Sequence, residues 1–207
     1  MKLIDYFFSN MDRNMIHKPV RYFDVYEKYF DKYKGFPIRV LEIGVENGGS
    51  LRMWKEYFGP QSEIVGIDIN PKCKEFECPG IKIYNGDQAN EAFLREIREK
   101  ELPFNIIIDD GGHFPVQQIT SWVHLFKHLT PNGIYLIEDV GTSYMKEYGG
   151  GRKEPSSFIE FAKLAVDSIN LEDNCPLRGV SFFRDIVVFE NGIIDDMRTL
   201  AIGRQMI

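Results

Sequence analysis

Cysteine is scarce in this sequence, and so are the marks of export. The three cysteines, Cys73, Cys78 and Cys175, are an odd number and form no disulfide framework, which suits a reducing compartment. No apolar run approaches the roughly 20 residues of a membrane-spanning helix, and the first ten residues lack a basic cluster. These absences predict a soluble, cytoplasmic protein with no membrane partner.

Positive charge is also in short supply. The chain has 25 Lys and Arg against 31 Asp and Glu, a formal net charge of -6, and its basic residues form no stripe. A nucleic-acid partner is therefore disfavoured. The length of 207 residues, 43% of them hydrophobic, suits one domain with one core. We expect a single domain over residues 1–207, with an N-terminal helical cap (1–36) and an α/β core (37–207).

Strand and helix patterns alternate along the chain. Short β-rich runs cover residues 38–44, 63–69, 81–87, 104–109 and 133–139, and apolar residues recur at helical spacing in 19–33, 50–58, 89–100, 115–129 and 156–168. This alternation predicts βαβ units and a mostly parallel sheet with helices on both faces. Two further β-rich pieces meet at Arg184 and Asp185, which predicts a closing hairpin with an antiparallel strand.

The turn after the first strand is rich in glycine. It runs from Glu42 to Ser50, but Glu46 stands where a dinucleotide-binding turn needs glycine, and its carboxylate would repel a phosphate. A cationic sulfonium cofactor suits this turn better than NAD or ATP. We expect Asp68, at the end of the second strand, to accept hydrogen bonds from ribose hydroxyls, and Asp87, at the end of the third, to accept one from an adenine amino group.

Carboxylates are densest at the ends of the fourth and fifth strands. Residues 108–113 read IDDGGH and residues 137–139 read IED. Because these strands are expected to be neighbours, Asp110, Glu138 and Asp139 converge, and three carboxylates at short range repel one another unless a cation lies between them. Ligation by oxygen alone favours Mg²⁺ or Mn²⁺ over Zn²⁺. An aspartate at a strand end can also merely cap a turn, but acidic residues at successive strand ends favour a ligand site.

Taken together, these motifs resemble those of a known family. The segments EIGVENGGSLRMWKEYF, GIDI, GDQ, IIIDDGGH and IEDVGTSY are similar to the metal-dependent sugar O-methyltransferases that modify macrolides and related glycosides, over about residues 39–151. The resemblance implies a Rossmann-like class I methyltransferase sheet of seven strands in the order 3-2-1-4-5-7-6, with the seventh antiparallel. It also implies S-adenosylmethionine as cofactor, with contacts from Glu42, Gly44, Ser50, Asp68, Asp87, Gln88 and Asp109.

The resemblance further implies roles for the acidic motifs. Asp110, Glu138 and Asp139 are expected to bind Mg²⁺, and His113 is expected to be the general base, with metal-bound Asp110 as the alternative base. A sugar hydroxyl bound to a divalent ion has a lowered pKa, and an imidazole, whose ordinary pKa is about 6.5, can then remove its proton. Tyr144 is expected to contact the substrate, and the glycines at 149–151 to form a lid.

The expected function is O-methylation of a sugar hydroxyl on a glycoside, a nucleotide sugar or a surface-polysaccharide precursor. Catechol-type methyltransferases carry a lysine three residues after the metal-binding Asp, so the histidine at that offset, His113, favours the sugar branch. The alternatives are methylation of a phenolic or other small-molecule hydroxyl, a non-catalytic cofactor-binding module and a hydroxylase-like relative. The family usually carries a longer N-terminal region, whereas fewer than forty residues precede the first strand here. The acceptor and any homo-oligomer are therefore left open.

Overall fold

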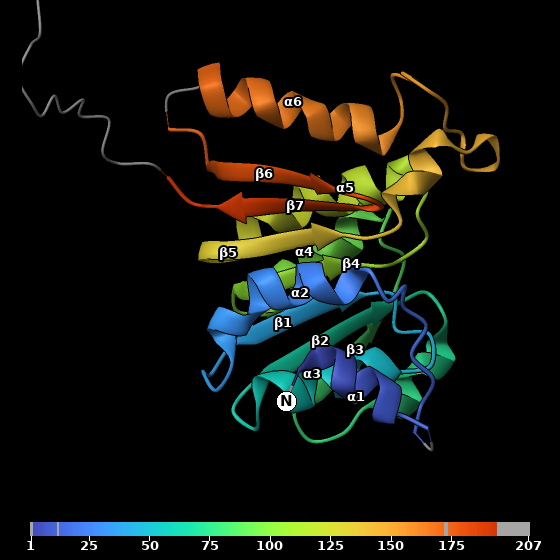
Figure 1. Cartoon of the computed structure of the whole chain (residues 1–207), viewed down its shortest axis with the longest axis vertical. Coiled ribbons are helices and arrows are strands. Elements are labelled where there is room, and N and C mark those ends of the chain that lie inside the picture. The colour runs from blue at the N-terminus through green and yellow to red at the C-terminus, as the bar shows by residue number, and fades with distance from the viewer. Residues whose placement is uncertain (1, 12, 172–173, 194–207) are drawn as a thin grey trace, which may run out of the picture.

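One twisted sheet organises the molecule. The computed structural model describes residues 2–11, 13–171 and 174–193. Seven strands lie in the order β3-β2-β1-β4-β5-β7-β6 (Figure 1). They are β1 (Arg39–Ile43), β2 (Glu63–Asp68), β3 (Ile81–Asn85), β4 (Phe104–Asp109), β5 (Leu129–Ile137), β6 (Leu177–Phe183) and β7 (Ile186–Asn191). β1 to β5 pair in parallel, and β7 is antiparallel to both of its neighbours. The expected α/β architecture and strand order are confirmed.

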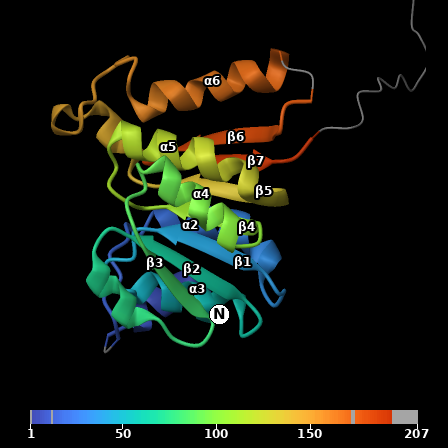
Figure 2. The same cartoon turned by 180° about the vertical axis from the view of Figure 1, so that it is seen from behind.

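Helices cover both faces of the sheet. One face carries α1 (Leu3–Ser9), α2 (Tyr22–Phe30) and α3 (Gly49–Phe58), and the other carries α4 (Glu91–Lys100), α5 (Pro115–Leu125) and α6 (Phe158–Leu171) (Figures 1 and 2). Short 3₁₀ helices are η1 (Asp31–Tyr33), η2 (Pro71–Phe76), η3 (Phe126–His128), η4 (Val140–Tyr144) and η5 (Lys146–Tyr148). None of the described helices is both long and apolar enough to cross a membrane.

The strands read as apolar runs because both of their faces are buried. In β4, Ile106 and Ile108 belong to the hydrophobic cluster beneath α2 and α3, whereas Ile107 belongs to the cluster beneath α4, α5 and α6. Alternate side chains of a strand point to opposite faces, so one strand serves both clusters. Burying a side chain of this size stabilises the fold by roughly 1.5–3 kcal/mol. The two clusters therefore fix where the strands end, and with them the site.

Two details differ from the expected elements. The helix α1 precedes the first expected helix, and residues 13–18, which precede α2, lie along the carboxyl edge of the sheet (Figure 1). The strand β5 begins at Leu129, four residues before the expected start at residue 133, and its pairing with β4 is interrupted between Leu129 and Ile134. Pro131, which has no backbone N–H to donate, lies within this interruption. The division of a single domain at residue 36 stays a prediction.

Candidate functional site

A cavity of about 600 Å³ opens at the carboxyl edge of the parallel strands. Ligands of open α/β sheets bind at this edge. Four of the expected cofactor contacts line the cavity: Gly44, Asp68, Asp87 and Gln88. Asp110, His113 and Asp139 line it as well, together with His17 from the N-terminal segment. The remaining expected residues, Glu42, Ser50, Asp109, Glu138 and Tyr144, are not among those that line it.

Gly44 lets two backbone segments cross at the floor of the cavity. Its φ is 91°, and a Cβ at this position would lie 2.0 Å from the carbonyl oxygen of Asp110. Gly111 is equally constrained, since a Cβ there would lie 1.8 Å from Oε1 of Gln88. No larger residue fits either position without moving the backbone or a buried side chain. The glycines therefore bring the cofactor turn and the IDDGGH motif into contact.

Asp68 braces the glycine turn from the end of β2. Its Oδ2 accepts hydrogen bonds from the backbone N–H groups of Val45 (2.8 Å) and Glu46 (3.0 Å), and its Oδ1 accepts one from Asn70 N–H (2.8 Å). Glu46 has a left-handed backbone, with a φ of 49°. The carboxylate thus holds a turn that few residues other than glycine adopt readily. Oδ2 already accepts two hydrogen bonds, but Oδ1 accepts only one from the backbone, so a lone-pair direction of Oδ1 is left for a ligand in the cavity.

Gln88 and Asp109 connect the third and fourth strand ends. Gln88 Nε2 donates to Asp109 Oδ1 (3.0 Å), and Gly112 N–H donates to Gln88 Oε1 (2.8 Å). Asp109 is fully buried and also accepts a hydrogen bond from Ser121 on α5. Burial raises the pKa of Asp109 to about 6, although these hydrogen bonds oppose the rise. Asp109 therefore faces α5 and positions Gln88, while Asp87 lines the cavity.

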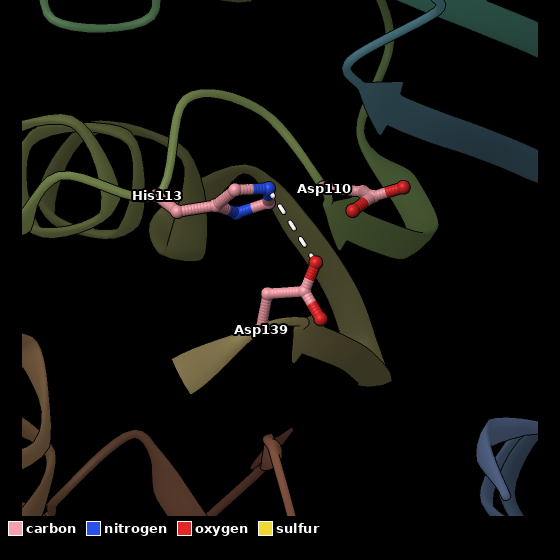
Figure 3. Close-up of side chains that lie close together, drawn as sticks. All are labelled: Asp110, His113 and Asp139. Atoms are coloured by element: carbon pink, nitrogen blue, oxygen red, sulfur yellow. Dashed lines mark ion pairs between the residues drawn. The ribbon is translucent and has the colours of Figure 1, made fainter. Parts of the chain in front are cut away.

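Asp110, His113 and Asp139 form the acidic group at the mouth of the cavity. One ligand atom from each lies within 4.8 Å of the others, a spacing suitable for a metal ion (Figure 3). His113 Nε2 lies 3.5 Å from Asp139 Oδ2, and His113 Nδ1 is buried without a hydrogen-bond partner among the described residues. His113 and Asp139 both have left-handed backbones, with φ of 61° and 52°. Such backbone conformations are costly and concentrate at functional sites.

Glu138 belongs to a second group of charged side chains, which is more deeply buried than the group of Asp110, His113 and Asp139. Lys18 Nζ donates to both carboxylate oxygens of Glu138 (3.0 Å each) and to Asp110 Oδ2 (2.5 Å), and lies 3.4 Å from Glu42 Oε1. Ser50 donates to the other oxygen of Glu42 (2.7 Å). Burial would lower the pKa of Lys18, but the three carboxylates raise it well above its ordinary value. The structure thus places a cation among these carboxylates, and Asp110 belongs to both groups.

Two tyrosines of α2 attach the acidic strand end to the first helical layer. Tyr26 donates to Glu138 Oε1 (2.7 Å), and Tyr22 donates to Asp139 Oδ1. The two tyrosines are four residues apart and so lie on one face of the helix. Burial raises the pKa of both hydroxyls, so they remain donors at neutral pH. In the sequence, both tyrosines lie in the apolar helical pattern of residues 19–33, which predicts no site role for either of them.

Lys18 and His17 are two further residues at the site that the sequence does not predict. Both precede the first strand and belong to no motif, and the partners of Lys18 are 24, 92 and 120 residues away along the chain. The i,i+4 spacing of Tyr22 and Tyr26, with two hydroxyls on one face, is the only sign of this layer in the sequence. Tyr144, at the end of η4, is 52% exposed and stands beside the site rather than in the cavity.

The sheet order, the glycine turn and the acidic strand ends define a class I methyltransferase fold. Within it, the chain resembles the sugar O-methyltransferases of macrolide and tetracenomycin pathways. A tetracenomycin rhamnosyl 3'-O-methyltransferase of Streptomyces olivaceus is 36% identical over 190 residues, which cover 81% of this chain and 48% of that protein. The mycinamicin VI 2''-O-methyltransferase of Micromonospora griseorubida is 42% identical over 132 residues, covering 60% of this chain and 33% of that protein.

Solved structures agree with this likeness. The MycE methyltransferase of the mycinamycin pathway, in complex with Mg, SAH and mycinamycin VI, superposes with a TM-score of 0.82 at 31% identity. The match covers 94% of this chain and 53% of that one. This chain thus spans about half the length of the relatives it matches or less. No family model matches the sequence.

Proposed function

We propose that this protein is an S-adenosylmethionine-dependent, Mg²⁺-assisted O-methyltransferase that acts on a sugar hydroxyl of a glycoside, nucleotide sugar or surface-polysaccharide precursor. The observation that carries the proposal is the convergence of Asp110, His113 and Asp139 at the mouth of a cavity that begins at Gly44. A methyl donor and a metal-assisted acceptor would meet at that point. The likeness to sugar O-methyltransferases supports the same reaction.

The cavity residues suit a nucleoside cofactor. Asp68 Oδ1 has one lone pair left for a ribose hydroxyl, and Asp87, whose Oδ1 accepts from Ala89 N–H (2.8 Å), borders the same cavity. Gly44 leaves the floor open for a thioether or sulfonium. The volume of about 600 Å³ lies within the usual range of ligand pockets. In this proposal Glu42, Ser50 and Asp109 act from behind the cavity wall, by positioning the residues that line it.

The donor set also fits a divalent cation. Asp110, Asp139 and the deeper Glu138 supply carboxylate oxygens, which hard cations prefer. We propose Asp110, Glu138 and Asp139 as the residues that hold the ion. When bound, a divalent ion lowers the pKa of a coordinated hydroxyl.

His113 is the proposed general base of the reaction. It would accept the hydroxyl proton while the acceptor oxygen forms a bond to the methyl carbon and the carbon–sulfur bond breaks, leaving a thioether, a methyl ether and a protonated imidazole. Asp139, 3.5 Å from His113 Nε2, would stabilise that imidazolium. Thr142 Oγ1 donates to the backbone carbonyl of His113 (3.2 Å) and helps hold its left-handed backbone.

An acceptor would enter beside η4 and η5. Tyr144 and Met145 are about half exposed there, and Phe114 packs against Tyr148 with ring centroids 5.1 Å apart. Tyr144 is the proposed acceptor contact, and the glycine loop 149–151 the proposed lid. We further propose a cytoplasmic location, consistent with three free cysteines, and no nucleic-acid substrate, consistent with the net charge of -6.

The proposal is tested by a panel of acceptors. Purified protein is assayed with S-adenosylmethionine and Mg²⁺ on glycosides, nucleotide sugars and catechol-type phenols, with and without EDTA. Methylation of sugar hydroxyls that EDTA abolishes is the expected result. If only the phenols are methylated, the acceptor is a phenolic hydroxyl and the proposed sugar substrate is wrong. Calorimetric binding of S-adenosylmethionine without any turnover would indicate a non-catalytic module.

Two variants separate the metal from the base. Asp110→Ala removes a charged ligand, so it should abolish activity at ordinary Mg²⁺ yet leave cofactor affinity nearly unchanged, and excess Mn²⁺ should partly restore it. His113→Ala should retain metal and cofactor binding but lose about 10²–10⁴-fold in kcat, with no rescue by Mn²⁺. Wild-type kcat in His113→Ala at neutral pH would transfer the role of base to a metal-bound carboxylate such as Asp110.

A further inference from the structure

Lys18 is a buried cation that the proposed reaction does not use. Its side chain is 2% exposed, and its ammonium contacts Glu42, Asp110 and Glu138, whose side chains are 0%, 21% and 1% exposed. Each of these three residues lies one position from the last residue of a different strand, β1, β4 or β5. One ammonium group therefore faces three carboxyl groups behind the lining of the cavity, and Asp110 is the member of this group that also lines the cavity.

The position of Lys18 is built into the fold. The segment before it is held by Asn14, which donates to the Asn47 carbonyl (2.7 Å), and by Arg13, which pairs with Glu56 (3.1 Å). It passes so close to α3 that a Cβ on Gly49 would lie 2.3 Å from the Met15 carbonyl oxygen. Pro19 follows Lys18 and restricts its backbone further. These contacts fix residues 13–18, which we call the N-terminal strap, and thereby fix the position of the Lys18 ammonium among the carboxylates.

The ammonium and a divalent ion would use the same oxygens. Lys18 Nζ is 2.5 Å from Asp110 Oδ2 and 3.0 Å from each oxygen of Glu138. Mg²⁺ binds carboxylate oxygens at about 2.0–2.1 Å, so an ion on Asp110 Oδ2 or on Glu138 would lie within a few ångströms of an ammonium held by the same oxygens. A second positive charge a few ångströms away would also repel the ion in this buried setting.

We propose that Lys18 competes with the divalent ion for Asp110 and Glu138 and thereby sets the metal affinity of the site. The inference rests on the metal site of the proposed function. In the metal-free protein, Lys18 balances the buried carboxylates and keeps them in place for the ion. When the ion binds, it displaces the ammonium from Asp110 and Glu138. Lys18 is accordingly a positioning residue, and its presence lowers the affinity of the site for the metal ion.

The test is a Mn²⁺ titration without cofactor or acceptor, followed by the electron paramagnetic resonance of free Mn²⁺. Lys18→Met keeps the length of the side chain and removes its charge, and Lys18→Arg keeps the charge. Arg13→Met removes a cation from the same strap, but from an exposed pair outside the site. We expect the Kd for Mn²⁺ to fall by about tenfold or more in Lys18→Met. We expect it to stay at the wild-type value in Lys18→Arg and Arg13→Met.

Thermal unfolding gives a second, independent readout. In EDTA, Lys18→Met should melt below the wild type, because its buried carboxylates have lost their counter-ion. Saturating Mn²⁺ should raise its melting temperature more than that of the wild type. If Lys18→Met does not fold, the double variant Lys18→Met/Glu42→Gln removes one buried charge of each sign, and the same tightening of Mn²⁺ binding is expected.

Wild-type or weaker Mn²⁺ affinity in the folded Lys18→Met or double variant overturns the inference. Lys18 would then only stabilise the fold. This failure is separate from failure of the proposed function. Tighter Mn²⁺ binding in a protein that methylates no acceptor supports the role of Lys18 and counts against the reaction alone. Metal-dependent methylation with equal Mn²⁺ affinity in the wild type and Lys18→Met counts against Lys18 alone.

Discussion

Gly44 shows how a single missing side chain shapes the site. Its φ of 91° and the 2.0 Å that would separate its Cβ from the Asp110 carbonyl oxygen are independent constraints. In Gly44→Ala the strand end carrying Asp110 must move, so we expect a stability loss of about 2–4 kcal/mol. We also expect at least a tenfold weaker affinity for S-adenosylhomocysteine. Urea unfolding and isothermal calorimetry measure the two effects.

Gly149→Ala is the matched control for this variant. Gly149 has a similar φ of 73°, but a Cβ there would meet nothing within 4 Å. It should therefore cost only the backbone strain of about 1 kcal/mol and leave cofactor affinity unchanged. Equal losses of affinity in both variants would show that the crossing of Gly44 over Asp110 does not shape the cavity.

Single residues also mark how far the sequence could predict the site. Asp68 and Asp110 were predictable, because the carboxyl ends of parallel strands meet at one edge of the sheet. Lys18 was not, because nothing local distinguishes a lysine before proline from any surface lysine. Its role depends on Glu138, a partner 120 residues away, which only the folded chain brings near.

The expected metal ligands fall into two groups because the side chains at the ends of β4 and β5 point in different directions. Successive side chains of a strand point to opposite faces. Asp109 accordingly turns to Ser121 on α5, whereas Asp110 turns to Lys18. Glu138 turns inward, and the left-handed backbone of Asp139 directs its carboxylate to His113. The order of the strands could be predicted from the sequence. The direction of each side chain just after the end of a strand could not be predicted, because regular alternation stops there.

The close packing of the N-terminal strap on α3 gives a prediction for Gly49. Replacing a helical glycine by alanine ordinarily stabilises a protein by roughly 0.5–1 kcal/mol. Here the new Cβ would lie 2.3 Å from the Met15 carbonyl oxygen and 2.5 Å from that of Asn14. We expect Gly49→Ala to lose about 1–3 kcal/mol instead and to raise hydrogen exchange in residues 13–18. Gly151→Ala, whose Cβ would meet only an ordinary contact at 3.6 Å, should be nearly neutral.

The short helix η3, after α5, contributes a pH-dependent contact far from the site. His128 Nε2 lies 2.9 Å from the Glu101 carbonyl oxygen, and burial lowers the pKa of His128 below 6.5. Below pH 6.5 the unfolded chain therefore binds more protons at this residue than the folded chain does, and the contribution of His128 to stability is lost as pH falls. The free energy of unfolding of the wild type, minus that of His128→Gln, should decrease from pH 7 to pH 5 in urea titrations. A difference that stays constant over this range would contradict the lowered pKa.

At the scale of the whole molecule, the cofactor cavity is made by the chain itself. Gly44, Asp68, Asp87 and Gln88 follow three adjacent strands, β1, β2 and β3, whose other faces are packed in the two hydrophobic clusters. Sheet and cavity are therefore one cooperative unit. The relatives are about twice as long as this chain. We expect this unit to bind the cofactor by itself.

Because S-adenosylhomocysteine would bind only this folded unit, it should stabilise the protein by mass action. At a ligand concentration one hundred times the Kd the gain is about 2.7 kcal/mol. For a domain of this size that corresponds to a rise in Tm of roughly 5–10 °C. Calorimetric melts should show the same rise in Gly149→Ala and a smaller one in Gly44→Ala at the same concentration. If the wild-type Tm did not move at millimolar ligand, the cavity would need a further part to bind the cofactor. In that case a polypeptide extended to the length of the relatives should recover the shift.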